Sequence, residues 1–206
     1  MSTHFQILSE YHELIAFFAG VLISIAAGFI YFQYIADPLG PFALDKNTEE
    51  VHVHSDFLMY INGNRIDFTD DKYQSATGHM LLEDFHLHDN NDSIIHRHAA
   101  GLTLSMFLNS LGYSLTDDCL ITDSDLKYCT NEERQTALFV NGTPVKNVDS
   151  YIPQETDQIL VFYGEVDSPK LTSYLSEISS DSCIYSGTCP ERGTPPPESC
   201  GLTCEI

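Results

Sequence analysis

Three His-x-His pairs lie within 47 residues of this 206-residue chain, and each falls in a stretch whose side chains alternate as they do in a β-strand. The pairs are His52-Val53-His54, His86-Leu87-His88 and His96-Arg97-His98. Side chains at positions i and i+2 of a strand point to the same face. Each pair is therefore predicted to present two imidazoles on one face of a sheet.

The first pair opens a segment, residues 51–61, in which apolar residues recur at every second position. Val53, Phe57 and Met59 would lie on the apolar face, and His52 and His54 on the opposite face. This pattern predicts a half-buried strand. Asn62-Gly63 follows directly, which is a strong signal for a hairpin turn back through residues 65–68.

The second and third pairs predict a hairpin with strands at residues 85–88 and 94–98. Phe85, Leu87 and Ile95 should face the core with Phe57, which leaves the histidines on the other face. Cross-strand partners share a face. A five-residue loop, 89–93, meets this condition and places His86 opposite His96. All six histidines then share one face if the first strand neighbours the hairpin.

Six imidazoles on one face suit Zn(II), Cu(II) or Ni(II), whereas Ca and Mg prefer oxygen ligands. Three or four imidazoles saturate one zinc ion, so six could hold one metal or two. Asp56 and Asp89 are candidates for a carboxylate ligand or an orienting partner of a ligand. The alternatives are a solvated polar face and a cluster that charges near pH 6. The predicted ligands are His52, His54, His86, His88, His96 and His98.

The remaining pattern predicts an α+β domain with a small mixed sheet and one main helix, similar to a β-grasp. Thr103 would cap that helix, which ends at Gly112. Further strands are expected at residues 137–140 and 158–163, and a short helix at 171–178. The predicted plan is a short N-terminal segment (1–13), an anchor (14–35), a linker (36–50), the His-rich domain (51–166), and a short helix with a Cys-rich tail (167–206).

Residues 14–35 contain no charged side chain. As a helix they would be roughly 33 Å long, enough to cross a hydrocarbon core of about 30 Å. A cleaved signal peptide would need a basic n-region, and no Lys or Arg occurs in residues 1–13. The segment is therefore predicted to be a single transmembrane anchor.

The six cysteines all follow position 118, an even set that favours disulfides and an oxidising compartment. The soluble part is accordingly expected on the extracytoplasmic side of the cell membrane. Cys119 and Cys129 are predicted to pair. The last four could form two disulfides, the favoured interpretation, or a zinc knot: Cys183, Cys189, Cys200 and Cys204.

Nine basic against 30 acidic residues give a formal net charge of −21. Nucleic-acid binding is excluded because phosphate contacts require clustered Lys and Arg. No HExxH, Ser-His-Asp, nucleophile-elbow or CxxC signature occurs, so an enzyme is the less favoured interpretation.

The stretch from His52 to Gly164 resembles a group of membrane-anchored, His-rich extracytoplasmic domains of archaea and unplaced bacteria. The resemblance lies in HVHSDFLMYINGNRIDF, HLHDNNDSIIHRHAAGLTLSMFLNSLG, LFVNGTPV and ILVFYGE, with CIYSGTCPERGTPPP in the tail. It implies a shared domain plan and adds no mechanism.

These observations predict a membrane-tethered domain that captures, buffers or delivers copper or zinc. The alternatives are a non-catalytic subunit of a membrane complex with structural histidines, and a metal-dependent enzyme.

Overall fold

The structure is a computed structural model that describes residues 18–25, 49–75, 81–166 and 169–197. The chain divides into two units, Met1–Asn47 and Thr48–Ile206. In the first unit, residues 18–25 form a helix with exposed apolar side chains. The described part of the chain contains no helix that is both long and apolar enough to span a membrane; the rest of the predicted anchor lies outside it.

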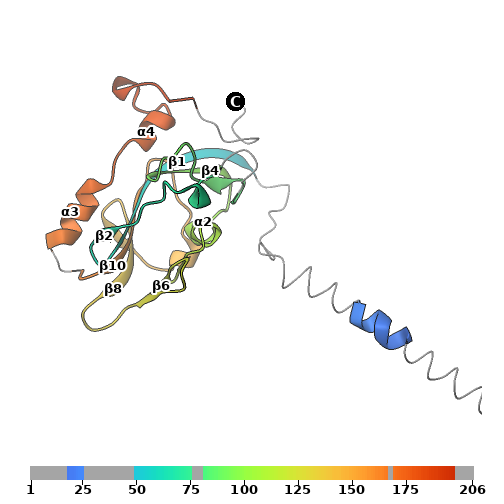
Figure 1. The fold of residues 1–206 in the computed structure, drawn as a ribbon. Coiled ribbons are helices and arrows are strands. Elements are labelled where there is room, and N and C mark those ends of the chain that lie inside the picture. The colour runs from blue at the N-terminus through green and yellow to red at the C-terminus, as the bar shows by residue number, and fades with distance from the viewer. Residues whose placement is uncertain (1–17, 26–48, 76–80, 167–168, 198–206) are drawn as a thin grey trace, which may run out of the picture. The chain divides into compact units, whose positions relative to one another are not determined.

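The second unit is built on a seven-stranded mixed sheet (Figure 1). With the helices beside it, this sheet confirms the predicted α+β class. Its strands lie in the order β3-β4-β1-β10-β8-β9, with β2 paired to β1. β1 and β10 are parallel, and the other neighbours are antiparallel. The strands are β1 (Glu50–Ile61), β2 (Asn64–Arg65), β3 (Phe85–His86), β4 (Ile94–Ala99), β8 (Gln135–Val140), β9 (Thr143–Val145) and β10 (Gln158–Gly164).

Several further elements surround this sheet. A separate three-stranded sheet, β5-β6-β7, was not predicted from the sequence, and it contains both cysteines that were predicted to pair. Its strands are β5 (Ser114–Leu115), β6 (Cys119–Ile121) and β7 (Lys127–Cys129). The helices are α2 (Leu104–Ser110), α3 (Pro169–Glu177) and α4 (Ser182–Tyr185), with 3-10 turns η2 (Asp71–Tyr73), η3 (Val148–Ser150) and η4 (Pro190–Arg192).

The predicted elements are present, with shifted ends. Thr103 caps α2 by accepting a hydrogen bond from the backbone N–H of Met106, as predicted. The predicted strand at 85–88 is shorter, because only Phe85 and His86 pair with β4. The predicted return strand at 65–68 is likewise reduced to Asn64–Arg65.

One face of the sheet packs against α2 through aromatic side chains. The Phe107 ring lies 5.7 Å from that of Phe57 on β1 and 5.0 Å from that of Phe85 on β3. Phe57, Phe85, Leu87 and Ile95 are almost fully buried, which places the predicted core residues inside the domain. The period-two argument identified this face correctly.

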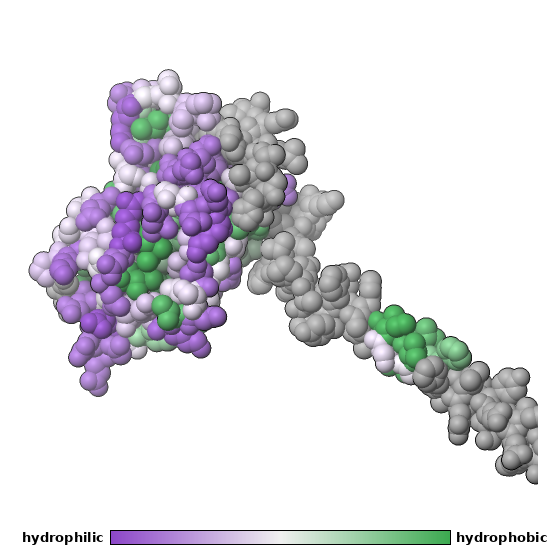
Figure 2. All heavy atoms as spheres, in the orientation of Figure 1, coloured by the Kyte–Doolittle hydropathy of each residue, from purple (hydrophilic) through white to green (hydrophobic). Residues whose placement is uncertain are grey.

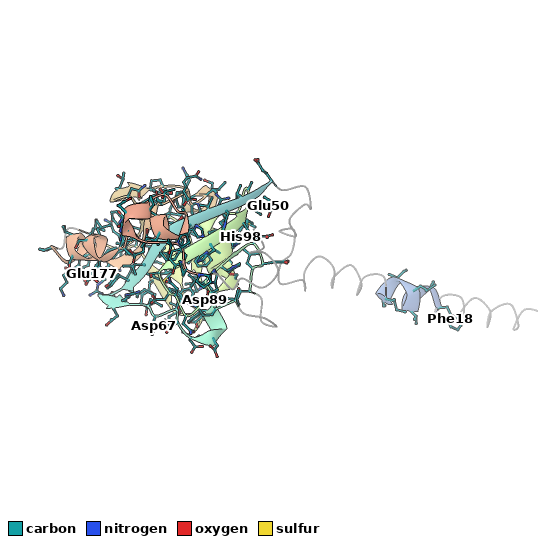
Figure 3. All side chains as sticks on the ribbon, turned by 90° about the horizontal axis from the view of Figure 1, so that it is seen from above. Phe18, Glu50, Asp67, Asp89, His98 and Glu177 are labelled. Atoms are coloured by element: carbon teal, nitrogen blue, oxygen red, sulfur yellow. A yellow bond between two sulfur atoms is a disulfide. The ribbon has the colours of Figure 1, made fainter. Side chains whose placement is uncertain are left out.

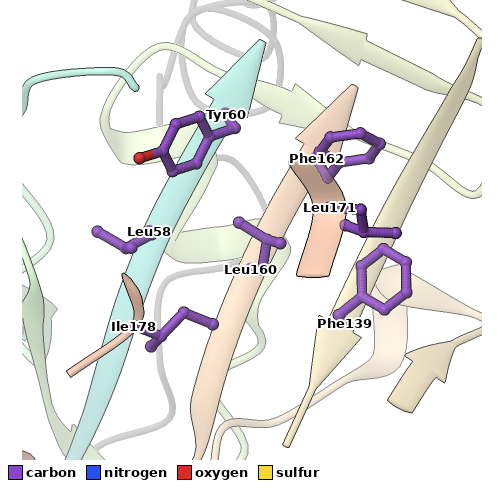
Figure 4. Packing of buried hydrophobic residues seen from close by; sticks show 7 residues of the cluster. All are labelled: Leu58, Tyr60, Phe139, Leu160, Phe162, Leu171 and Ile178. Atoms are coloured by element: carbon purple, nitrogen blue, oxygen red, sulfur yellow. The ribbon is translucent and has the colours of Figure 1, made fainter. Parts of the chain in front are cut away.

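The opposite face is also covered, so the expectation that β1 is half-buried was wrong. An apolar cluster occupies this face beside the C-terminal half of β1 (Figure 4). Its members are Leu58, Tyr60, Phe139, Leu160, Phe162, Leu171 and Ile178. The last two come from α3 and the segment after it, which supply the cover that a solvent-facing strand would lack.

Polar groups reinforce the packing of α3. The Tyr60 hydroxyl donates a hydrogen bond to the Glu177 carboxylate, and the Tyr60 and Tyr174 rings stack at 4.0 Å. Burial, followed by the nearby Glu177 carboxylate, raises the pKa of Tyr60 to about 12. The hydroxyl therefore stays protonated and acts as a donor at neutral pH.

Candidate metal centre

Strand pairing sets three of the six histidines in one row. His96 on β4 pairs with His54 on β1 at one side and with His86 on β3 at the other. The predicted pairing of His86 with His96 is therefore confirmed. Because β4 lies between β1 and β3, His96 is the central member of the row.

The other three histidines extend this row in both directions, two residues along each strand. His52 lies beyond His54, His98 beyond His96, and His88 beyond His86. Side chains at i and i+2 of a strand share a face, which places His52 and His98 on the side of the row. His88 lies just beyond the end of β3, and its ring joins the same side by contact with that of His96 at 4.0 Å.

Ring contacts join the six imidazoles into a closed circuit. The distances between successive ring centroids, in the order 52, 54, 96, 88, 86, 98 and back to 52, are 4.5, 4.7, 4.0, 5.6, 5.3 and 4.8 Å. Two imidazoles that bind one metal through nitrogens at 2.0–2.1 Å have centroids about 4.5–5.5 Å apart for bond angles of roughly 90–120°. Most of these contacts fall close to that range.

Five of these imidazoles are buried and one is exposed. His86 and His96 have no solvent-exposed surface, His54, His88 and His98 are at most 5% exposed, and His52 is exposed. Figure 3 labels His98 and Asp89, which lie in the same part of the domain in that view, whereas Glu177 lies at the far end. The cluster is an internal feature of the domain, so a solvated polar face does not describe it.

The group best arranged for a metal consists of His52, His54 and His96. One ligand nitrogen from each lies within 4.8 Å of the others. Three nitrogens around a common ion would be about 3.3 Å apart, so small side-chain rotations complete the site. A three-histidine group of this kind could hold a transition metal ion, and its geometry does not select which one.

Hydrogen bonds define the tautomers of two histidines. His86 donates from Nδ1 to the Glu83 carbonyl at 2.8 Å, and His88 donates from Nδ1 to the Asp89 carboxylate at 2.8 Å. Both partners are acceptors, so Nδ1 carries a proton, and in the neutral ring the lone pair is on Nε2. Such outer partners orient histidine ligands in metal sites. Asp89, which the sequence offered as a carboxylate ligand or an orienting partner, accepts this hydrogen bond from His88, whereas Asp56 binds residues 179–182 instead.

The same reasoning applies to His54. Its Nδ1 lies 3.1 Å from the Ser186 hydroxyl oxygen. That hydroxyl has one hydrogen, for which the Glu155 carboxylate and the Ser182 carbonyl are acceptors. If that hydrogen goes to either of these acceptors, the Ser186 oxygen accepts from His54 Nδ1 and the lone pair of a neutral His54 ring is on Nε2.

Residues after Ser179 cover the histidines, an arrangement that the sequence did not reveal. The Tyr185 ring lies 5.8 Å from that of His54 and 5.6 Å from that of His96. Asp56 receives hydrogen bonds from Ser179, Asp181 and Ser182 and so anchors this segment. The buried Asp56 in an apolar strand was the available signal, because such a carboxylate needs several donors.

A pocket of about 480 Å³ opens beside His88 and His96. Asp89, Asp92 and Tyr185 contribute to its wall, and the Asp92 carboxylate is paired with the Arg65 guanidinium at 2.7 Å, so Asp89 carries the net negative charge of this group. Negative charge at the entrance of a cleft raises the local concentration of cations. The net charge of −21 acts in the same direction, because it attracts cations to the protein as a whole. Figure 2 shows hydrophilic residues over most of the visible face.

A second set of acidic residues lies on the other flank of the cluster. The Glu83 carbonyl binds His86, and the neighbouring Asp84 carbonyl accepts the backbone N–H of His98 at 2.7 Å. Burial, followed by the charges of Glu83 and Glu50, raises the pKa of Asp84.

The described part of the domain contains two disulfides. Cys119–Cys129 joins β6 to β7, as predicted. Cys183–Cys189 closes a loop around the end of α4 and takes two of the thiolates that a four-cysteine zinc knot would require. Cys200 and Cys204 lie outside the described residues.

Comparisons with protein-family models, with curated proteins and with solved structures found no match.

Proposed function

We propose that this protein is a membrane-tethered, extracytoplasmic metal-binding domain that captures, buffers or delivers copper or zinc. The observation that supports it is the group of His52, His54 and His96, whose ligand nitrogens lie within 4.8 Å of one another inside a circuit of six imidazoles. Imidazole is a good ligand for both metals, and affinity alone follows the order that favours copper.

The arrangement of the domain agrees with binding rather than with catalysis. The histidines lie on paired strands under a disulfide-stapled cover, which holds ligands in fixed positions. The exposed His52 gives a metal one entry point, and the acidic pocket at His88 gives another. We also propose a β-grasp-like topology, supported by the central parallel β1–β10 pair and by α2 packed across one face.

The full-length protein, purified in detergent, is expected to retain at least one zinc or copper ion per chain after loading and removal of unbound metal. Elemental analysis against protein concentration measures this ratio. His79→Ala is the matched control, because it removes a histidine outside the three pairs, and it should retain the wild-type ratio.

The competing function, a non-catalytic subunit with structural histidines, predicts a different result. Retention below about one-tenth of an ion per chain with both metals would contradict metal binding and favour that alternative, since three imidazoles at this spacing, two of them buried, should hold an ion through removal of unbound metal.

The membrane placement is proposed from the uncharged segment 14–35 and from the disulfides, and it can be tested separately. Protease added to intact cells should remove the His-rich domain, because disulfides persist on the extracytoplasmic side. Immunoblotting with an antibody to residues 48–206 measures the loss, and a cytoplasmic protein serves as the control. Full protection of the domain in intact cells, with digestion after lysis, would overturn this placement.

A further inference from the structure

We propose that the cluster holds two metal ions, and that His96 bridges them through its two ring nitrogens. The first ion lies at His52, His54 and His96, and the second at His86, His88 and His96. This inference rests on the proposed function and extends it, because a three-histidine site uses only half of the imidazoles.

The second site follows from three ring distances. The centroids of His86, His88 and His96 form a triangle with sides of 5.6, 4.0 and 6.2 Å. A point equidistant from all three lies about 3.2 Å from each centroid, and a metal bound at 2.0–2.1 Å lies about 3.2 Å from the centre of an imidazole. The centroid distances therefore leave room for one ion between the three rings. Among the described residues, the group whose ligand nitrogens already converge is His52, His54 and His96, so the second site forms only after the side chains of His86, His88 and His96 rotate.

Hydrogen bonding prepares this second group independently of the distances. The Nδ1 protons of His86 and His88 are donated to Glu83 and Asp89, so each ring carries its lone pair on Nε2. Carboxylate and carbonyl partners of this kind are typical of histidines that bind metals. The pocket of about 480 Å³ is lined by the same His88 and His96, which places it next to this second group.

His96 is the residue that both groups share. It pairs with His54 on one side and with His86 on the other, and it is completely buried. The two nitrogens of an imidazole point in different directions, so one ring can bind an ion on each side. Binding the second ion removes the remaining N–H proton of His96, which passes to solvent, and the ring becomes an imidazolate.

The experiment uses the full-length protein loaded with Cu(II), with elemental analysis and electron paramagnetic resonance on the same sample. Two copper ions per chain are expected. Their resonance intensity should fall well below that of two isolated Cu(II) ions, because an imidazolate bridge couples the unpaired spins. His88→Ala should retain one ion, and the remaining copper should give the full intensity of an isolated centre.

The outcomes separate the two proposals. One copper per chain in the wild type would overturn the second site and leave the proposed function standing, whereas no bound copper would overturn both. Two copper ions with full, uncoupled intensity would overturn the bridge. The wild-type measurements decide these points even if His88→Ala does not fold, and His79→Ala should match the wild type throughout.

Discussion

Asp56→Ala is expected to release the C-terminal cover, residues 179–192, from the sheet and to lower the free energy of unfolding by about 2–4 kcal/mol. Asp56 is completely buried on β1. Its Oδ1 accepts hydrogen bonds from the Ser179 hydroxyl and from the backbone N–H of Asp181, the latter at 2.8 Å. Its Oδ2 accepts from the Ser182 hydroxyl at 2.5 Å. Alanine would leave these donors buried without an acceptor.

The size of this effect is limited by the docking energy of the segment. Charge-assisted hydrogen bonds contribute about 1.5–3 kcal/mol each but are not additive. Once the segment detaches, water satisfies its donors and no further stability is lost. Local release, with the central sheet intact, is therefore the expected result.

Amide hydrogen exchange measures the release directly. Residues 179–192 should exchange much faster in Asp56→Ala than in the wild type, while β10 stays protected. Asp56→Asn retains one acceptor oxygen and should have an intermediate effect. Asp71→Ala removes an exposed aspartate and serves as the control. Unchanged protection of residues 179–192 in Asp56→Ala would show that other contacts hold the segment.

The sequence predicts the strand faces well because that information is local. Period-two alternation placed Phe57 and Phe85 in the core, and the odd-numbered loop placed His86 opposite His96. Both results depend only on neighbours along one strand or across one hairpin. The same local rule placed the two imidazoles of each pair on one face, whereas bringing all six together also required β1 to pair with β4.

The cover over the histidines could not be predicted in this way. Asp56 and Ser182 are separated by 126 positions, and no periodic pattern links them. The segment after Ser179 has few apolar residues, so hydropathy gives no indication that it packs on a sheet. Its docking depends on a buried carboxylate far away in the sequence and on contacts of Tyr185 and Ser186 with the histidines, which exist only in the folded chain.

The parallel pairing of β1 with β10 also required the structure. Leu58 and Tyr60 lie beside Leu160 and Phe162, about one hundred positions further along the chain. Together they create the second apolar face, on which α3 packs. The sequence contained a partial sign of it, because Leu58 and Tyr60 are apolar or aromatic at positions predicted to face solvent.

His96→Ala is expected to remove most of the stabilisation that metal gives to the folded protein. His96 belongs to the three-histidine group, and its ring also lies 4.0 Å from that of His88. Removing an outer partner of a metal ligand already costs 10–100-fold in affinity, so loss of the ligand itself should cost at least about 100-fold.

Because the metal binds the folded protein and not the unfolded chain, a lower metal affinity reduces the free energy of unfolding. With free metal at 100 times the dissociation constant, binding stabilises the wild type by about 2.7 kcal/mol. A 100-fold weaker site at the same metal concentration provides only about 0.4 kcal/mol. The metal-induced rise in Tm, about 5–10 °C for a domain of this size, should fall to about 1 °C in the variant.

Thermal unfolding of each protein with and without zinc measures this difference, and the comparison corrects for any loss of packing in the metal-free variant. His79→Ala should show the full wild-type rise in Tm. His52→Ala should retain more of the metal-induced rise in Tm than His96→Ala, because His52 is exposed at one end of the cluster whereas His96 is buried at its centre.

A wild-type rise in Tm that persists in His96→Ala would show that the ion binds without the central histidine, and the three-histidine site would then be wrong.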